Sequence, residues 1–170
     1  WSGARRQTVA IPWTRIYDEA TALAFADRIN ATPRFVVSGG TAIGRALEVA
    51  LGELETNGYE GRRRVIDVSG DGRTNVGIRP SRMRDLAITR GITINGLAIL
   101  NEEWALDRYY LDEVIGGTGA FLMTATDYQD FARAITAKLV REISGAPIAR
   151  RDAPRRPAAP DIARHTTAPH

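Results

Sequence analysis

Residues 64–75 read Arg-Val-Ile-Asp-Val-Ser-Gly-Asp-Gly-Arg-Thr-Asn, and this stretch indicates the fold class. Its first half is a short apolar run rich in β-branched residues, which is typical of a strand buried on both faces of a parallel sheet. The Asp-Gly turn at Asp71 and Gly72 then ends the strand. In open α/β sheets, ligands bind in loops at the carboxyl ends of the strands. The stretch therefore predicts a buried strand at residues 64–69 that leads Asp71 into a ligand-binding loop.

A second candidate loop precedes the first in the chain. Residues 38–44 read Ser-Gly-Gly-Thr-Ala-Ile-Gly and open a predicted amphipathic helix. A carboxylate from Asp71 and a hydroxyl from Thr41, brought to one edge of a sheet, are the oxygen ligands that Mg²⁺ prefers. Three alternatives stay open at this stage. The Asp71 carboxylate can cap N–H groups of its own turn, Thr41 can be the N-cap of the helix, and the Gly-rich loop can hold an anion.

The apolar pattern predicts strands that alternate with helices, which indicates a mostly parallel sheet with right-handed crossovers. The predicted strands are residues 7–13, 64–69, 92–100 and 120–124, and the predicted helices are residues 18–30, 41–57, 80–90, 106–114 and 127–143. We expect these elements to form one α/β domain over residues 1–143. In residues 144–170, Ala, Pro and Arg dominate and the periodicity disappears, so this tail is predicted to be disordered.

The composition excludes several classes of function. The chain has no Cys, so disulfides and thiolate metal sites are excluded. Both histidines, His165 and His170, lie in the tail, which excludes a Ser-His-Asp triad or a His-rich zinc site in the predicted domain. No apolar run approaches the roughly 18 residues that span a membrane. Five Arg and two Asp in the tail account for the formal net charge of +3, so the domain has no charge bias toward nucleic acid.

The chain resembles the von Willebrand factor A-type (vWA) domain, and more closely the bacterial vWA-like family of unknown function called DUF1194. The resemblance runs from residue 1 to about residue 143, and its most specific stretches are residues 1–3, 39–44, 64–72, 91–99, 109–110 and 114–117. It implies a Rossmann-like fold with a mostly parallel sheet flanked by helices. It also implies a metal-ion-dependent adhesion site for Mg²⁺, in which Thr41 and Asp71 are metal ligands.

The chain departs from the vWA pattern at its start. The family's site also uses an Asp-x-Ser-x-Ser motif at the end of a first, central strand, and no such motif precedes residues 1–3. The resemblance therefore implies that this strand and most of the metal shell are missing from the sequence as given, with an unpaired sheet edge left at residues 64–69. We expect this sequence to bind Mg²⁺ weakly or not at all. The resemblance also implies an extracytoplasmic, periplasmic type of location.

Two further polar residues, Asp67 and Ser69, lie inside the predicted strand. A carboxylate inside a strand is costly unless it is paired. We therefore expect Asp67 either to hydrogen-bond to groups that surround the metal or to pair with Arg62 or Arg64. Ser69 is a candidate for the same outer role around the metal, and Asn75 is expected to order the loop.

The resemblance favours a non-enzymatic protein-interaction module, in which an acidic side chain of a protein partner completes the coordination of Mg²⁺. A metal-dependent hydrolase or phosphotransferase that uses Asp71 is the alternative. However, it lacks a base and a phosphate-binding Lys, and Asp67 lies roughly 13 Å from Asp71 along a strand at about 3.3 Å per residue, too far for a two-metal centre. A metal-free structural domain is the third possibility. Metal titration separates the first from the third, and product formation from phosphoesters would identify the second.

Overall fold

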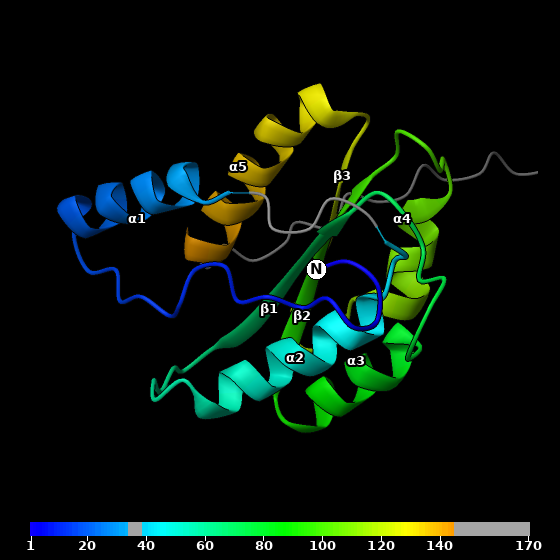
Figure 1. Ribbon diagram of the computed structural model, residues 1–170, viewed down its shortest axis with the longest axis horizontal. Helices are drawn as coiled ribbons and strands as arrows, with labels where there is room; N and C mark the ends of the chain where they lie inside the picture. The colour runs from blue at the N-terminus through cyan, green and yellow to red at the C-terminus, as the bar shows by residue number, and fades with distance from the viewer. Residues whose placement is uncertain (34–38, 145–170) are drawn as a thin grey trace, which may run out of the picture.

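The computed structural model describes residues 1–33 and 39–144 (Figure 1). In chain order its elements are α1 (Glu19–Ala31), α2 (Ile43–Thr56), β1 (Arg64–Gly70), α3 (Pro80–Thr89), β2 (Ile92–Ile99), α4 (Leu106–Tyr109), the π-helical turn η1 (Tyr110–Val114), β3 (Leu122–Ala125) and α5 (Tyr128–Ser144). The three strands form an open parallel sheet in the order β1-β2-β3. The fold is therefore α/β, with a Rossmann-like parallel sheet flanked by helices, as predicted. The predicted disordered tail, apart from Ser144, lies outside the described residues.

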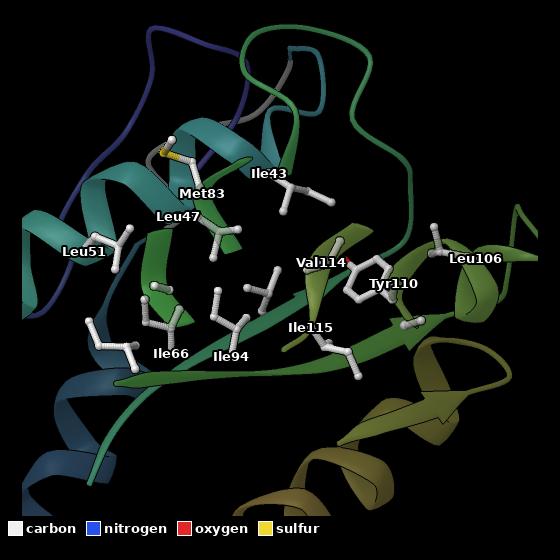
Figure 2. Packing of buried hydrophobic residues seen from close by; sticks show 14 residues of the cluster. Ile43, Leu47, Leu51, Ile66, Met83, Ile94, Leu106, Tyr110, Val114 and Ile115 are labelled. Carbon is white, nitrogen blue, oxygen red and sulfur yellow. The ribbon is translucent and has the colours of Figure 1, made fainter. Parts of the chain in front are cut away.

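Helices cover the sheet in layers (Figure 1). One face packs against α2, α3 and the α4–η1 segment through the larger core, where Leu47, Ile94 and Tyr110 are fully buried (Figure 2). The other face packs against α5 through a smaller core that includes Leu97 and Ala134. The middle strand, β2, is buried along almost its whole length, as expected for a central parallel strand. The loops that follow β1 and β2 therefore leave the sheet at one edge.

The edge strand β1 is buried on one face only. It pairs with β2 and with no other strand in the described part of the chain, so residues 64–69 form a sheet edge there, as predicted. Ile66 and Val68 are buried in the larger core, whereas Asp67 between them lies on the opposite face with a side chain that is 32% exposed. The predicted burial on both faces is wrong because α5, on the opposite side of the sheet, packs mainly on β2 and β3.

The strand predicted at residues 7–13 is not formed, and this prediction is wrong. The segment lies beside α2 and β1, where Val9, Ile11 and Trp13 line an apolar groove of about 340 Å³. Its apolar side chains therefore contact an apolar surface although its backbone forms no strand hydrogen bonds. Pro12 has no N–H to donate to a neighbouring strand, which disfavours pairing further.

The helix predicted at residues 18–30 forms as α1 for a local reason. Asp18 accepts a hydrogen bond from the Thr21 N–H at 2.8 Å, and the Thr21 hydroxyl accepts from the Asp18 N–H at 3.1 Å. This reciprocal capping box satisfies two N–H groups at the start of the helix. No residue of α1 is buried, and Leu23 is 60% exposed. Capping and internal hydrogen bonds, rather than packing, therefore account for α1 in the described part of the chain.

Candidate functional site

Two loops meet at the carboxyl end of β1. Thr41 lies in the loop before α2, and Gly72 and Asn75 lie in the loop after β1. The Thr41 N–H donates to Asn75 Oδ1 at 2.9 Å, and the Asn75 N–H donates to the Thr41 carbonyl at 2.9 Å. Gly72 lies close to the Thr41 hydroxyl, because a Cβ at Gly72 would be 3.6 Å from Thr41 Oγ1. The prediction that Asn75 orders the loop is confirmed, and its side chain joins the two loops.

Thr41 is not the N-cap of the following helix. The cap position of α2 is Ala42, whose side chain accepts no hydrogen bond. The Ile43 N–H in the first turn donates to Thr74 Oγ1 at 3.2 Å, so a hydroxyl from the neighbouring loop takes the capping role. The N-cap alternative for Thr41 is therefore wrong. Ser38, which the anion-binding alternative includes, lies outside the described residues.

Asp71 makes a contact that the sequence did not predict. Its carboxylate accepts a hydrogen bond from the hydroxyl of Tyr128, the first residue of α5. Within the described residues the carboxylate accepts no hydrogen bond from an N–H group of its own turn, so the alternative of a self-capped Asp-Gly turn is wrong. The Tyr128 contact ties the loop after β1 to the start of α5.

Two tyrosines of the α4–η1 segment lie against the Asp71 loop. The Tyr109 hydroxyl accepts a hydrogen bond from the Thr74 N–H at 3.1 Å. The Tyr110 hydroxyl lies next to Gly70, where a Cβ would be only 2.8 Å from Tyr110 Oη. Burial, and to a lesser extent the negative charge of Asp71, raises the pKa of Tyr110, so its hydroxyl stays protonated at neutral pH.

A cluster of charged and polar side chains lies between the sheet and α5. Lys138 is fully buried and donates to Asp67 Oδ1, and its Nζ lies 3.4 Å from Glu142 Oε1. The side-chain amide of Asn95 donates to Glu142, and Asn95 Oδ1 accepts from the Phe121 N–H at 3.0 Å. We call Asp67, Lys138, Glu142 and Asn95 the α5 cluster. It joins β1, β2 and α5.

Asp67 and Ser69, the two predicted outer residues of the metal site, differ in what the structure shows for them. Asp67 pairs with Lys138 in the α5 cluster, so the expected pairing with Arg62 or Arg64 is wrong. No hydrogen bond or ion pair within the described residues joins Asp67 or Ser69 to the two loops of the candidate site. Lys138 could have been found from the sequence, because the only Lys of the chain lies on the apolar stripe of the last helix.

The α5 cluster holds two carboxyl groups and one ammonium group. Burial raises the pKa of Asp67 to about 7, and its hydrogen bond with Glu142 acts in the same direction, against Lys138. Burial also disfavours ionised Glu142, but hydrogen bonds with Asp67 and Asn95 outweigh it and lower the pKa of Glu142. The proton that the two carboxyl groups share therefore resides on Asp67 at mildly acidic pH.

The raised pKa of Asp67 predicts that stability falls as pH rises. Between its ordinary pKa of 3.8 and about 7, the folded state holds a proton on Asp67 that the unfolded state has lost. The free energy of unfolding should therefore drop by about 1–2 kcal/mol between pH 5 and pH 8, after allowing for partial solvent screening. Asp67→Asn keeps the neutral form at every pH, and its urea midpoint should stay nearly constant over this range.

The matched control for this pH dependence is Asp85→Asn on α3, where the Asp85 side chain is 64% exposed and forms an ion pair with Arg84. Its unfolding midpoint should follow that of the unmodified chain between pH 5 and pH 8. Equal slopes for Asp67→Asn and the unmodified chain would contradict the assignment of the shared proton to Asp67.

Comparison with known protein families matches residues 1–147 to DUF1194, described as a protein of unknown function. The chain belongs to the DUF1194 family. Neither the curated proteins nor the solved structures contain a match to this DUF1194 chain. The family membership that the sequence motifs predicted is therefore confirmed.

Two features of this DUF1194 chain bear on its ligands. In residues 1–33 and 39–144, no helix has the length and apolar character needed to cross a membrane. In the same ranges, no three His, Cys, Asp or Glu side chains are grouped as a metal site would require. Of the predicted metal ligands, the two loops carry the Asp71 carboxylate, which is hydrogen-bonded to Tyr128, and the Thr41 hydroxyl, which lies near Gly72.

Proposed function

We propose that this DUF1194 chain is a non-enzymatic protein-interaction module of the vWA type. Its binding site is the loop pair at the carboxyl end of β1, where Asp71 and Thr41 supply two of the several ligands that Mg²⁺ requires. When bound, Mg²⁺ supplies an open coordination position for an acidic side chain of a protein partner. The observation that carries the proposal is the junction of the two loops by Asn75, with the backbone of Gly72 against the Thr41 hydroxyl.

The donor set fits Mg²⁺ better than other common metals. Mg²⁺ takes hard oxygen ligands and keeps several waters, so one or two carboxylates together with hydroxyl groups are sufficient. Asp71 provides the charge, and its loop is held by the Tyr128 hydroxyl on one side and the Asn75 side chain on the other. The chain's own contribution is thus a carboxylate and a hydroxyl on two loops that the Asn75 side chain joins.

The α5 cluster supports a binding module rather than a hydrolase. A two-metal hydrolytic centre needs several carboxylates close to both ions. Asp67, the nearest carboxylate along β1, is paired with Lys138, away from the loop pair. Asp71 therefore has no second carboxylate from its own strand with which to share metals.

Calorimetric titration of Mg²⁺ and Mn²⁺ into the full-length gene product tests the proposal. We expect the unmodified protein to bind, and Asp71→Asn to weaken binding at least about tenfold, because it removes the charged ligand. Thr41→Val, which removes a hydroxyl and keeps the shape, should weaken binding less. Asp85→Asn is the control, since it removes an exposed carboxylate on α3 and should leave the affinity unchanged.

The same titration names the outcomes that overturn the proposal. Absence of binding, or equal binding by Asp71→Asn and the unmodified protein, would leave a metal-free structural or interaction domain. Release of product from a phosphoester substrate, lost in Asp71→Asn, would instead identify a metal-dependent hydrolase.

A further inference from the structure

Lys138 is a buried amine that the proposed function leaves unused. Its side chain has no solvent exposure, and its Nζ contacts Asp67 on β1 and Glu142 one turn further along α5. Lys is among the residues least often fully buried, because its ammonium group is strongly hydrated in water. Apolar residues in place of a buried ion pair are often as stable or more stable. Stability alone therefore does not explain why charged groups lie at this place.

The fold holds the amine against a carboxyl group. Lys138 lies on the face of α5 that packs on the sheet, one turn after the buried Ala134. Its Nζ lies 6.0 Å from the centre of the Phe121 ring, so the amine is enclosed next to Asp67. Reacting groups that are held in a productive geometry reach effective concentrations of about 10⁵–10⁸ M. The contact therefore supplies the proximity that an amine and a carboxyl group lack when they are free in water.

The surroundings also favour the forms of the two groups that react. An amide forms from a neutral amine and a protonated carboxyl group. Burial raises the pKa of Asp67 to about 7, so its carboxyl group is protonated in many molecules near neutral pH. Transfer of one proton from the Lys138 ammonium to Asp67 gives an uncharged pair, which burial disfavours less than it disfavours an ion pair.

Glu142 contacts both groups. Its Oε1 lies 3.4 Å from Lys138 Nζ, and its carboxyl group is hydrogen-bonded with that of Asp67. Hydrogen bonds with Asp67 and Asn95 lower the pKa of Glu142, so its carboxylate is available to accept a proton. A base within reach of the proton that it takes is the first requirement of proton-transfer catalysis. Glu142 is therefore placed to carry a proton from the nitrogen of Lys138 to an oxygen of Asp67.

We propose that an amide bond between Lys138 Nζ and Asp67 Cγ joins α5 covalently to β1. The neutral amine attacks Cγ of the protonated carboxyl group, and a C–N bond forms. Glu142 takes a proton from the nitrogen and passes it to a hydroxyl group of the tetrahedral intermediate, whose C–O bond then breaks. Amine and acid thus give amide and water, and the step needs no oxidant or reductant. The Asp67 side chain is 32% exposed, which gives the released water a route to solvent.

The bond ties the edge strand of the described sheet to a helix that packs mainly on the two other strands. It joins residues 71 positions apart in the chain, and such a cross-link restricts the unfolded state. Neither Asp67 nor Lys138 titrates once the bond has formed. The stability effects expected for the α5 cluster therefore belong to the chain before bond formation, and the mass of a sample shows which form it contains. The modification does not depend on the metal site.

Mass spectrometry of the full-length gene product, folded and kept near neutral pH, tests the proposal. We expect an intact mass that is lower than the mass of its sequence by one water molecule. After trypsin digestion, residues 65–73 and 134–141 should appear as one branched peptide, because Lys138 is no longer a cleavage site. Glu142→Gln should keep the full mass, because an amide does not accept the proton. Glu55→Gln, which removes the carboxylate of an exposed ion pair on α2, should lose water as the unmodified protein does.

The branched peptide of the unmodified protein decides the proposal, whether or not each variant folds. A full sequence mass for the unmodified protein would overturn the proposal and leave an ordinary buried ion pair. Loss of water from a linear peptide 65–73, with normal cleavage after Lys138, would also overturn it, because a cyclic imide at Asp71 and Gly72 gives that pattern. Formation of the branched peptide in Glu142→Gln to the same extent would contradict the role of Glu142 in the step.

Discussion

Replacement of Lys138 by Met is expected to lower the free energy of unfolding by about 3 kcal/mol at pH 8. Lys138 is fully buried, and its ammonium group is the cation that balances Asp67 and Glu142 in the α5 cluster. Met keeps most of the apolar stem of Lys138. The loss of stability therefore measures the removal of the charge rather than a change in side-chain volume. At pH 5 the cost should be smaller, because Asp67 is already protonated there and Lys138 then balances only Glu142. Urea denaturation at both pH values measures the difference.

Arg133→Met on the same helix is the matched control. Arg133 forms an ion pair with Asp130, and its side chain is 75% exposed, so the change should cost less than about 1 kcal/mol. It should also show little dependence on pH between 5 and 8. An equally small effect of Lys138→Met at pH 8 would contradict the assignment of a buried charge at this position.

The elements that the sequence predicted well are those whose signals are local. The runs at residues 64–70 and 92–99 combine β-branched residues with sharp ends, and both form strands of the parallel sheet. α3 begins with Pro80 in its first turn and is followed by Gly91 with a φ of +67°, as its sequence predicted. In these cases the chain itself supplies both the preference and the stop signal.

The failures arise where the outcome depends on a partner element. Residues 7–13 have a strand-like pattern, but a strand also needs a neighbour that accepts and donates ladder hydrogen bonds. The second face of β1 was predicted to be buried, but α5 lies mainly over β2 and β3. Composition and periodicity indicate which residues prefer burial. They do not show which other helix or strand will cover those residues.

The candidate site was also only partly predictable from the sequence. The placement of the loops of Thr41 and Asp71 at one edge follows from parallel strands, whose carboxyl ends lie together. The contacts that hold the Asp71 loop come from Tyr128 and Tyr109, which lie far along the chain and in different helical segments. Spacing in the sequence carries no information about such contacts, so these two tyrosines could be recognised only from the fold.

Replacement of Gly44 by Ala is expected to destabilise the protein by about 3 kcal/mol, although Ala is the better helix former. Gly44 lies fully buried in the first turn of α2, against the backbone of Ile78 just before α3. A Cβ at Gly44 would lie 2.7 Å from the Ile78 carbonyl carbon and 3.1 Å from that of Arg79. Backbone atoms cannot rotate away as a side chain can, so α2 and the loop before α3 would have to separate.

Gly52→Ala provides the opposite result on the same helix. A Cβ at Gly52 would have open space around it, so Ala there should stabilise the protein by about 0.5–1 kcal/mol through helix propensity alone. Urea denaturation of both variants therefore measures the same substitution with opposite signs. Because α2 begins two residues after Thr41, separation of α2 from its neighbours in Gly44→Ala should also displace the loop pair, and Mg²⁺ affinity should fall with stability. Gly44→Ala that is as stable as the unmodified chain would show that α2 does not pack this closely against the segment before α3.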